Sequence, residues 1–276
     1  MIINILGYGA VVKKFIHLFH DDFPGIAFQF YLRQPDVSLN LNNVSFHHLE
    51  SYQPDGTTIC CLSVNEESIL KTSTSSSRLT VAKPNLELIN QFIAKGFFNS
   101  GRHYILTNPS ELIAEYIIKK SGNNDIYALG LSVDEARYKS ILPSFGISPL
   151  QHQFDILGNH YQYPIINFHH YQNQNINLIH DLLHALSVKT RSEFTGFKPP
   201  ISGGVNAMLD IVNAIYHKRR IMISGYSSTD DAVIAGYLTP DSDHFHIPSA
   251  NIAAQDLLET TLATHRSNYQ KIAEKV

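Results

Sequence analysis

The most constraining stretch of this sequence lies at its start, where a short apolar run meets two closely spaced glycines. Residues Ile2–Leu6 are typical of a buried strand, Gly7 and Gly9 follow directly, and an amphipathic helical pattern continues over Val11–His20. A strand that turns sharply into a helix through Gly-x-Gly is a common first unit of a parallel α/β sheet, because glycine permits the bend. The amides at the start of such a helix lack helical partners and can face an anion.

Further apolar runs extend this unit into a doubly wound sheet. They are separated by helical patterns or turn residues, and their weak apolar–polar alternation is typical of strands buried on both faces. The predicted strands are Ile2–Leu6, Ile26–Leu32, Val44–His48, Thr57–Val64 and Tyr104–Thr107, and the predicted helices are Val11–His20, Asn85–Ala94 and Glu111–Lys120, the last with Ser110 as its N-cap. The fold class predicted for residues 1–125 is therefore an N-terminal Rossmann doubly wound parallel sheet.

Beyond about Ser121 the alternation of strands and helices becomes irregular. The predicted elements are helix Val133–Leu142, strand Phe154–Leu157, helices near Leu178–Ser187 and Val205–His217, and strands Arg220–Ser224 and Ala232–Leu238. This pattern predicts a C-terminal α+β catalytic or substrate domain over residues 126–276.

The composition narrows the environment and the partners. A formal net charge of -3 with 16% charged residues gives neither the signature of disorder nor the basic footprint of a nucleic-acid-binding protein. Cys60 and Cys61 are adjacent in a predicted strand, where an ordinary disulfide between them would be strained, and this suits a reducing compartment. The chain has no basic leader and no apolar run of membrane-spanning length. We therefore expect a cytoplasmic protein without membrane or nucleic-acid partners.

The opening turn matches a dinucleotide-binding turn in part. Gly7 and Gly9 stand where one glycine permits the bend and the next lets the backbone approach a pyrophosphate, and the amides of Ala10 and Val11 begin the helix. The third glycine of that pattern, which allows close packing of helix on strand, is replaced by Val12. The turn alone is compatible with a cofactor site and with an ordinary tight turn.

The end of the second predicted strand bears on which cofactor would bind. The acidic residue that holds the ribose hydroxyls of NAD is absent, since Leu32 stands near that position and Arg33 follows it. Arg33 can neutralise the 2′-phosphate of NADP, or it is a solvated arginine at a strand end. Between the two forms of NAD(P), the sequence favours NADP.

Five stretches, in this chain order, resemble segments of the lactate/malate dehydrogenase family. They are "GYGAVV" (Gly7–Val12), "SSRLTVAKPNLELI" (Ser76–Ile89), "TNPSELIAEYIIKKSG" (Thr107–Gly122), "VDEARYKSIL" (Val133–Leu142) and "SPLQHQFDILGNHYQYPI" (Ser148–Ile165). The resemblance spans roughly the first two thirds of the chain. It implies a divergent and shortened NAD(P)-dependent 2-hydroxy acid dehydrogenase, which would move a hydride between NAD(P)H and a small 2-oxo or 2-hydroxy acid.

The resemblance also implies roles for individual residues. His160 matches the proton donor, Asp134 the carboxylate that orients it, and Arg78 the arginine that polarises the substrate carbonyl. Arg137 matches the arginine that grips the substrate carboxylate, and Asn108 the asparagine that contacts substrate or cofactor. The chemistry needs these types together, because reducing a carbonyl requires a proton, stabilisation of the developing alkoxide and an anchor for the acid.

Several positions depart from the family pattern. Thr72 stands where the family selects the substrate side chain, so neither a lactate-type nor a malate-type assignment transfers, and Lys71 beside it is a candidate pyrophosphate contact. Leu62–Asn65 replaces a Thr-Ala-Gly segment, which puts close approach of the cofactor in doubt. Tyr161 replaces the glycine after the proton donor, and small residues at Pro200–Gly204 would leave room for a larger substrate.

Three questions stay open at this stage. A dehydrogenase relative that binds nucleotide or oxo acid without turnover is one alternative, motivated by the altered cofactor positions. A zinc enzyme is another, because "HDLLH" places His180 and His184 one helical turn apart, with His169, His170 or the pair His244 and His246 as further ligands. A homo-oligomer is possible, but little sequence separates the second and third strands for the helix that often contributes to subunit contacts.

Overall fold

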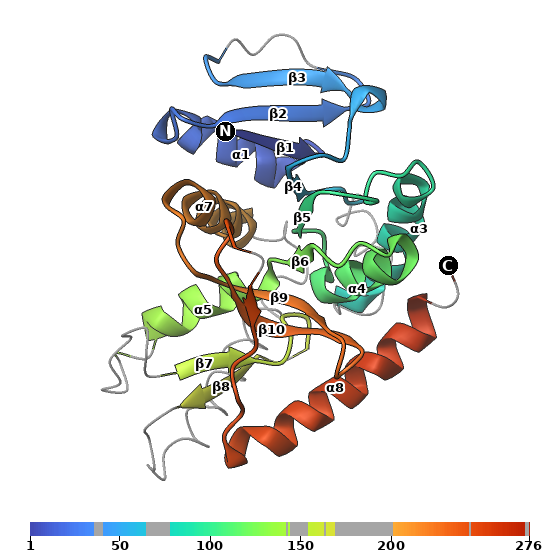
Figure 1. Ribbon diagram of the computed structural model, residues 1–276, viewed down its shortest axis with the longest axis vertical. Helices are drawn as coiled ribbons and strands as arrows, with labels where there is room; N and C mark the ends of the chain where they lie inside the picture. Colours follow the sequence, from blue (N-terminus) through green and yellow to red (C-terminus); the bar gives the residue numbers. More distant parts are fainter. Residues whose placement is uncertain are drawn as a thin grey trace.

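The computed structural model describes residues 1–35, 41–64, 78–141, 143, 154–162, 164–168, 201–242, 244–273 and 276. For a few residues inside helices and strands, Arg78 and Arg137 among them, the description covers the backbone alone. Figure 1 shows the described elements arranged around one large twisted sheet.

The N-terminal part of this sheet is parallel and has the Rossmann strand order. Its strands are β1 (Ile2–Leu6), β2 (Ala27–Leu32), β3 (Val44–His48), β4 (Thr57–Cys60), β5 (Arg102–Ile105) and β6 (Ile126–Ala128). They lie in the order β3-β2-β1-β4-β5-β6, and each neighbouring pair is parallel. The predicted doubly wound sheet is confirmed, with β1 and β4 side by side at the point where the order reverses.

The sheet continues past β6 with antiparallel strands. They are β9 (Ile221–Ser227), β10 (Ala232–Leu238) and the short β11 (Phe245–His246). β9 joins β6 through the pair Ala128 and Ser224, so in the part described one nine-stranded sheet spans both predicted units. A separate two-stranded antiparallel sheet consists of β7 (Phe154–Leu157) and β8 (Ile165–Phe168). The division at residue 125 stays a prediction.

Helices cover both faces of the large sheet (Figure 1). They are α1 (Ala10–Phe19), α3 (Ala82–Ile93), α4 (Ser110–Ser121), α5 (Gly130–Ile141), α7 (Ile201–His217) and α8 (Ile252–Ala273), with short 3-10 turns η1 (His20–Asp22), η2 (Leu49–Ser51) and η3 (Arg78–Val81). α1 and α7 contribute to one apolar cluster, and α3 and α4 contribute to another. No helix of the described residues is long and apolar enough to cross a membrane.

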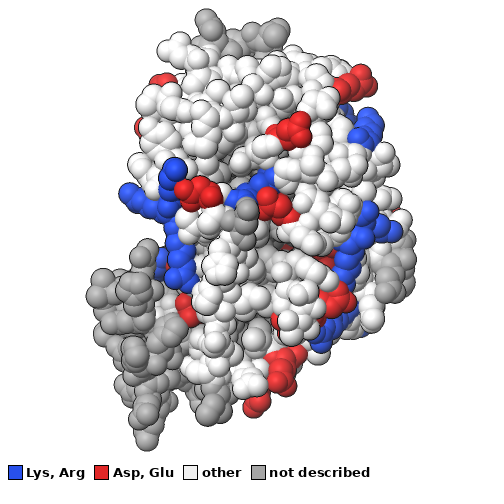
Figure 2. Space-filling model, in the orientation of Figure 1, with Lys and Arg blue, Asp and Glu red and all other residues white. Residues whose placement is uncertain are grey.

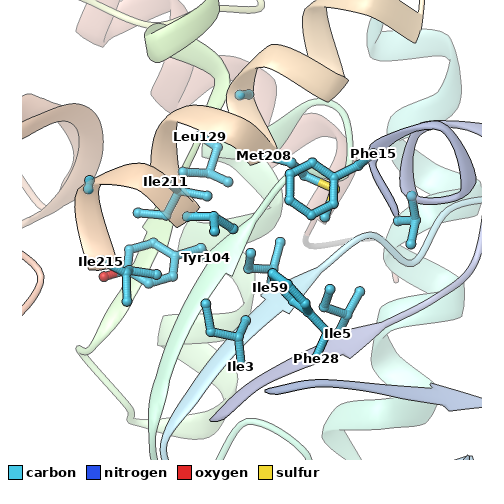
Figure 3. Packing of buried hydrophobic residues seen from close by; sticks show 14 of the residues in the cluster. Ile3, Ile5, Phe15, Phe28, Ile59, Tyr104, Leu129, Met208, Ile211 and Ile215 are labelled. Atoms are coloured by element: carbon cyan, nitrogen blue, oxygen red, sulfur yellow. The ribbon is translucent and has the colours of Figure 1, made fainter. Parts of the chain in front are cut away.

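Alternation along the strands assigns each side chain to one of these clusters. Ile3, Ile5 and Ile59 face the cluster that also holds Phe15 and Met208, whereas their neighbours Leu6 and Cys60 face the other, as expected for a period of two. Figure 3 shows the first cluster, with side chains of α1 and α7 packed on those of the strands. All of these strand residues are fully buried, so the central strands are packed on both faces by the two clusters.

The structure corrects several element boundaries. β4 ends at Cys60 rather than Val64, and β5 runs over Arg102–Ile105 rather than Tyr104–Thr107, so the residues that follow both strands lie in the connections at the sheet edge. Pro109, not Ser110, is the N-cap of α4, and Ser110 is inside the helix with its hydroxyl donating to Glu111 at 3.2 Å. The predicted helix Leu178–Ser187 lies outside the described residues.

Both cysteines carry free thiols, and charged side chains are scattered over the surface drawn in Figure 2. Cys60 and Cys61 are both free, and burial raises the pKa of Cys60 to about 12, so its thiol keeps its proton. On the face drawn in Figure 2, acidic and basic side chains are interspersed among much larger uncharged areas.

Candidate active site

A pocket opens at the carboxyl edge of the sheet, beside the reversal of strand order. It has a volume of about 640 Å³ and is lined by residues that follow three strands, among them Gly7 after β1, Arg33 after β2 and Leu62 after β4. Open α/β sheets bind ligands at this edge, outside the carboxyl ends of the strands at the switch point. The backbone after β4, Leu62 to Val64, lines the pocket directly. The altered segment thus contributes to the pocket rather than closing it.

The two glycines of the opening turn have different reasons to be glycine. Gly7 has a φ of 99°, and a Cβ atom there would lie 2.8 Å from the Cys61 carbonyl oxygen, so the fold itself requires glycine. Gly9 has an ordinary φ of -76°, and a Cβ atom there would meet no described atom within 4 Å. Nothing in the described fold requires glycine at this position, which leaves room for a ligand to approach the backbone.

The start of α1 is suited to an anion. Gly9 is the N-cap and offers no side-chain hydrogen bond to the first amides of the helix, and the carbonyl of Gly9 accepts from the Lys13 amide at 3.0 Å. The amides of Ala10 and Val11 come before that first helical hydrogen bond, and Lys13 lines the pocket. A helix N-terminus with free amides and a neighbouring cation favours a phosphate group.

Close packing of α1 is achieved through a different glycine from the usual one. Val12 is fully buried in the core, whereas a Cβ atom at Gly204 of α7 would lie 2.9 Å from the Val11 side chain. The small residue in the "SGG" segment therefore lets α7 approach α1. The sequence predicts that this segment leaves room for a larger substrate. In the structure, however, the residue next to Gly204 is Val11 of α1.

Arg33 is exposed at the end of β2 and lines the pocket. It also borders an adjoining hollow of about 280 Å³, together with His48 and Lys95. Three basic side chains therefore surround this extension of the pocket, with Glu50 as an acidic neighbour.

The strongest polar contact near the sheet edge joins two of the predicted catalytic residues. His160 Nδ1 lies 2.5 Å from the Asp134 carboxylate. Both residues are buried, with 5% of His160 and 3% of Asp134 exposed to solvent. Asp134 comes from α5, and His160 from the turn after β7, which begins at Gly158 with a φ of 81°. Because a carboxylate accepts only, Nδ1 is the ring nitrogen that donates its hydrogen to Asp134.

A buried glutamate that the sequence analysis missed fixes the backbone of this turn. Glu111, in the first turn of α4, is fully buried and accepts from the His160 amide at 3.0 Å and from the Ser224 hydroxyl at 3.4 Å. Gly130 at the start of α5 lies against the same residue, since a Cβ atom there would be 2.5 Å from His160 Cβ. Glutamate is common in the first turn of a helix, so the sequence carries no signal that Glu111 is buried.

A further buried residue connects the pocket to the segment carrying Asn108. The Asn85 side chain accepts from the Val64 amide at 2.8 Å and donates to the Asn108 carbonyl at 2.7 Å. The Thr107 hydroxyl donates to the Leu62 carbonyl at 2.6 Å. These bonds hold the connections after β4 and β5 together. Asn108 precedes α4, which begins at Ser110 and carries Glu111 as its second residue. The pocket and the His160 turn therefore belong to one edge of the sheet.

The remaining predicted site residues are described in part or not at all. Arg78 begins η3, and Arg137 follows Asp134 by one turn of α5, with the description of both restricted to the backbone. Lys71 and Thr72 lie outside the described residues, as do His180, His184, His169 and His170 of the zinc alternative. Within the described part, Gly7 and Arg33 line the pocket, Gly9, Ala10 and Val11 form the end of the opening turn and the start of α1, and Asp134 and His160 contact each other.

Comparison with known proteins gives matches in structure but not in sequence. No family model matches the chain, and no curated protein matches it. The crystal structure of MGS-M5, a lactate dehydrogenase from a Medee basin deep-sea metagenome library, is similar with a TM-score of 0.74 and 18% identity, covering 99% of this chain and 98% of the other. The apo malate dehydrogenase from Picrophilus torridus is similar with a TM-score of 0.70 and 15% identity, covering 99% and 97%. The chain has the fold of these two proteins along essentially its whole length.

Proposed function

We propose that this protein is an NAD(P)-dependent 2-hydroxy acid dehydrogenase that moves a hydride between NAD(P)H and a small 2-oxo acid. The observation that carries the proposal is the buried pair of His160 and Asp134, joined at 2.5 Å at the same sheet edge as the open glycine turn. The similarity to structures of a lactate and a malate dehydrogenase adds support through the fold.

The residues of the opening turn fit a dinucleotide. The space in front of Gly9, the free amides of Ala10 and Val11, and Lys13 together suit a pyrophosphate. When bound, the nicotinamide supplies or takes up the hydride. Lys71 is a further candidate for the pyrophosphate contact, as the sequence suggests.

In this proposal, His160 handles the proton. With Nδ1 donating to Asp134, the imidazolium form donates from Nε2 to the substrate oxygen as hydride reaches the carbonyl carbon. In the reverse direction the neutral ring accepts the hydroxyl proton. Burial of the pair strengthens the attraction between imidazolium and carboxylate, because water screens it less there than at the surface.

The arginines and Asn108 complete the proposed substrate site. Arg137 lies three residues after Asp134 on α5, so a bidentate grip on the substrate carboxylate can come from the helix that orients His160. Arg78 polarises the carbonyl, Asn108 contacts substrate or cofactor, and Thr72 is the candidate residue for selecting the substrate side chain. Since Thr72 is uncharged, a substrate with a second carboxylate would lack its usual partner there.

The Gly9→Ala variant tests the fit of the cofactor. We expect its affinity for NADPH, measured by nicotinamide fluorescence, to fall about 10- to 100-fold, because the added methyl group would occupy the space in front of α1. Without cofactor its thermal midpoint should equal that of the wild type. Gly7→Ala is the matched comparison and should lower the thermal midpoint, since it conflicts with a positive φ and the Cys61 carbonyl. Equal affinity of wild type and Gly9→Ala for NADPH would contradict this assignment of the pocket.

Arg33→Asp tests the preference for NADP. The basic surroundings formed by Arg33, His48 and Lys95 favour a 2′-phosphate. Replacing Arg33 should raise KM for NADPH about 10- to 100-fold, the value of one charge-assisted hydrogen bond, and lower KM for NADH. Lys14→Asp makes the same charge change on an exposed site of α1 and should leave the ratio of the two constants within about twofold. An unchanged ratio in Arg33→Asp would remove this residue from cofactor selection.

The whole proposal is tested by following oxidation of NADPH and NADH with a panel of 2-oxo acids of varied side chain. Turnover with at least one of them is the expected result. Cofactor or oxo-acid binding without turnover across the panel would instead favour the non-catalytic relative. We further propose a cytoplasmic location, which cell fractionation would test, and a homo-oligomer, which analytical ultracentrifugation would test.

A further inference from the structure

A second series of buried hydrogen bonds involves Tyr161, the residue after the proposed proton donor His160. It has no part in the proposed chemistry. The Tyr161 hydroxyl is 2.6 Å from His265 Nδ1, and His265 Nε2 is 2.7 Å from the Glu115 carboxylate. His265 is fully buried in α8, and Glu115 and Tyr161 are nearly so. Glu115 also accepts from the Val233 amide at 3.1 Å and from Lys119 at 2.9 Å. Buried groups of this kind are retained only when they are fully hydrogen-bonded, as these are.

The partners set the direction of the hydrogen bonds. Burial alone would raise the pKa of Glu115, but hydrogen bonds from His265 and Lys119 outweigh it and lower the pKa below its ordinary value, so the group is a carboxylate. A carboxylate accepts only, so His265 donates from Nε2 to Glu115. Burial raises the pKa of Tyr161 above its ordinary value, so the phenol keeps its hydrogen, and its hydroxyl bonds both His265 Nδ1 and the Asn268 side chain.

This series of hydrogen bonds, from Glu115 through His265, ends at Tyr161, the residue directly after His160. Glu111 and Glu115 are one turn apart on α4, and each reaches the His160 turn: Glu111 through the His160 amide and Glu115 through His265 and Tyr161. The turn is thus attached to α4 at two successive residues. Tyr161 stands where the resemblance implies glycine, and its ring centroid lies 5.6 Å from that of His265.

We propose that His265 is a positioning residue for His160, acting through the Tyr161 hydroxyl to hold the imidazole in register with Asp134. The inference rests on the proposed function for its kinetic consequence, but its geometric consequence, the integrity of the His160–Asp134 hydrogen bond, does not depend on it. His265 touches neither substrate nor cofactor in this scheme.

Two variants remove the same hydrogen bond from opposite ends. Tyr161→Phe deletes the hydroxyl, and His265→Gln deletes Nδ1 while its amide can still donate to Glu115. Each should lower kcat for 2-oxo acid reduction about tenfold, with KM and cofactor affinity within about twofold, because a small displacement of a catalytic group affects the chemical step. The double variant should lose no more than Tyr161→Phe alone, since that change already removes the bond between Tyr161 and His265.

Tyr52→Phe is the matched control for a merely structural effect. It also deletes a buried tyrosine hydroxyl, 2.9 Å from the Thr58 hydroxyl, away from the His160 turn. Its thermal midpoint should fall about as much as that of Tyr161→Phe, with kcat within about twofold of wild type. Equal kcat in Tyr52→Phe and Tyr161→Phe would overturn the proposal.

A proton NMR readout separates this inference from the function. The short hydrogen bond between His160 Nδ1 and Asp134 should give a low-field proton signal, identified by its loss in His160→Gln. We expect the signal in wild type and Tyr52→Phe, and its broadening or loss in Tyr161→Phe and His265→Gln. An unchanged signal in the last two variants would overturn the positioning role. If wild type reduced no 2-oxo acid, the proposed function would fail while this comparison still decided the role of His265.

Discussion

His160→Gln is expected to lower kcat for 2-oxo acid reduction by about 10² to 10⁴, the usual contribution of a positioned general acid. Glutamine retains the backbone amide that donates to Glu111 and is close to imidazole in size, so the turn should keep its conformation. It cannot release a proton at neutral pH, so the alkoxide that forms as hydride arrives must take its proton from water.

Cofactor binding distinguishes this loss from a general disruption. His160 does not line the described pocket beside the glycine turn, so the affinity of His160→Gln for NADPH should stay within about twofold of wild type. Single-turnover oxidation of NADPH by rapid mixing would measure the chemical step itself. Wild-type turnover in this variant would show that another group supplies the proton and would remove His160 from the mechanism.

Asp134→Asn should have an effect of similar size for a different reason. The amide has nearly the same shape as the carboxylate but no charge, so it neither stabilises the imidazolium nor enforces hydrogen on Nδ1. We expect kcat for reduction to fall about 10²- to 10⁴-fold, as in other enzymes where the orienting carboxylate of a catalytic histidine is neutralised. The pH above which reduction declines should also move downward, because less imidazolium is present at a given pH.

Glu135→Gln controls for the loss of one negative charge on α5. Glu135 is the next residue, and its carboxylate pairs with Lys139 at 2.8 Å on the helix. This substitution should leave both kcat and the pH profile of reduction close to wild type. A pH profile that shifts equally in the two variants would mean that Asp134 acts as a distant charge and does not hold His160.

The sheet was the most predictable part of the structure. Apolar runs such as Ile2–Leu6 coincide with strands, because burial on both faces leaves a continuous apolar signature. The pair of His160 and Asp134 was also predictable, since chain order and motif resemblance placed both in one site and the structure brings them to 2.5 Å. Their catalytic roles stay predictions until kinetics test them.

Other elements left too little signal in the sequence. β6 has three residues and β11 has two, which is shorter than any pattern of alternation can establish. α8, which carries His265, was missed although it runs for 22 residues, because its apolar positions form no strong stripe. Glu111 and His265 could not be recognised as buried partners, since their hydrogen bonds span 49 and 150 residues of chain and exist only after folding.

The pairing of β6 with β9 joins the N-terminal parallel strands to the antiparallel strands that follow them. Ser224 of β9 is the residue that pairs with Ala128, and its hydroxyl also donates to Glu111, which accepts from the His160 amide. Hinge bending between the halves would strain this strand pair and these buried bonds together. A destabilising substitution in β9 should therefore also disturb the backbone of the His160 turn.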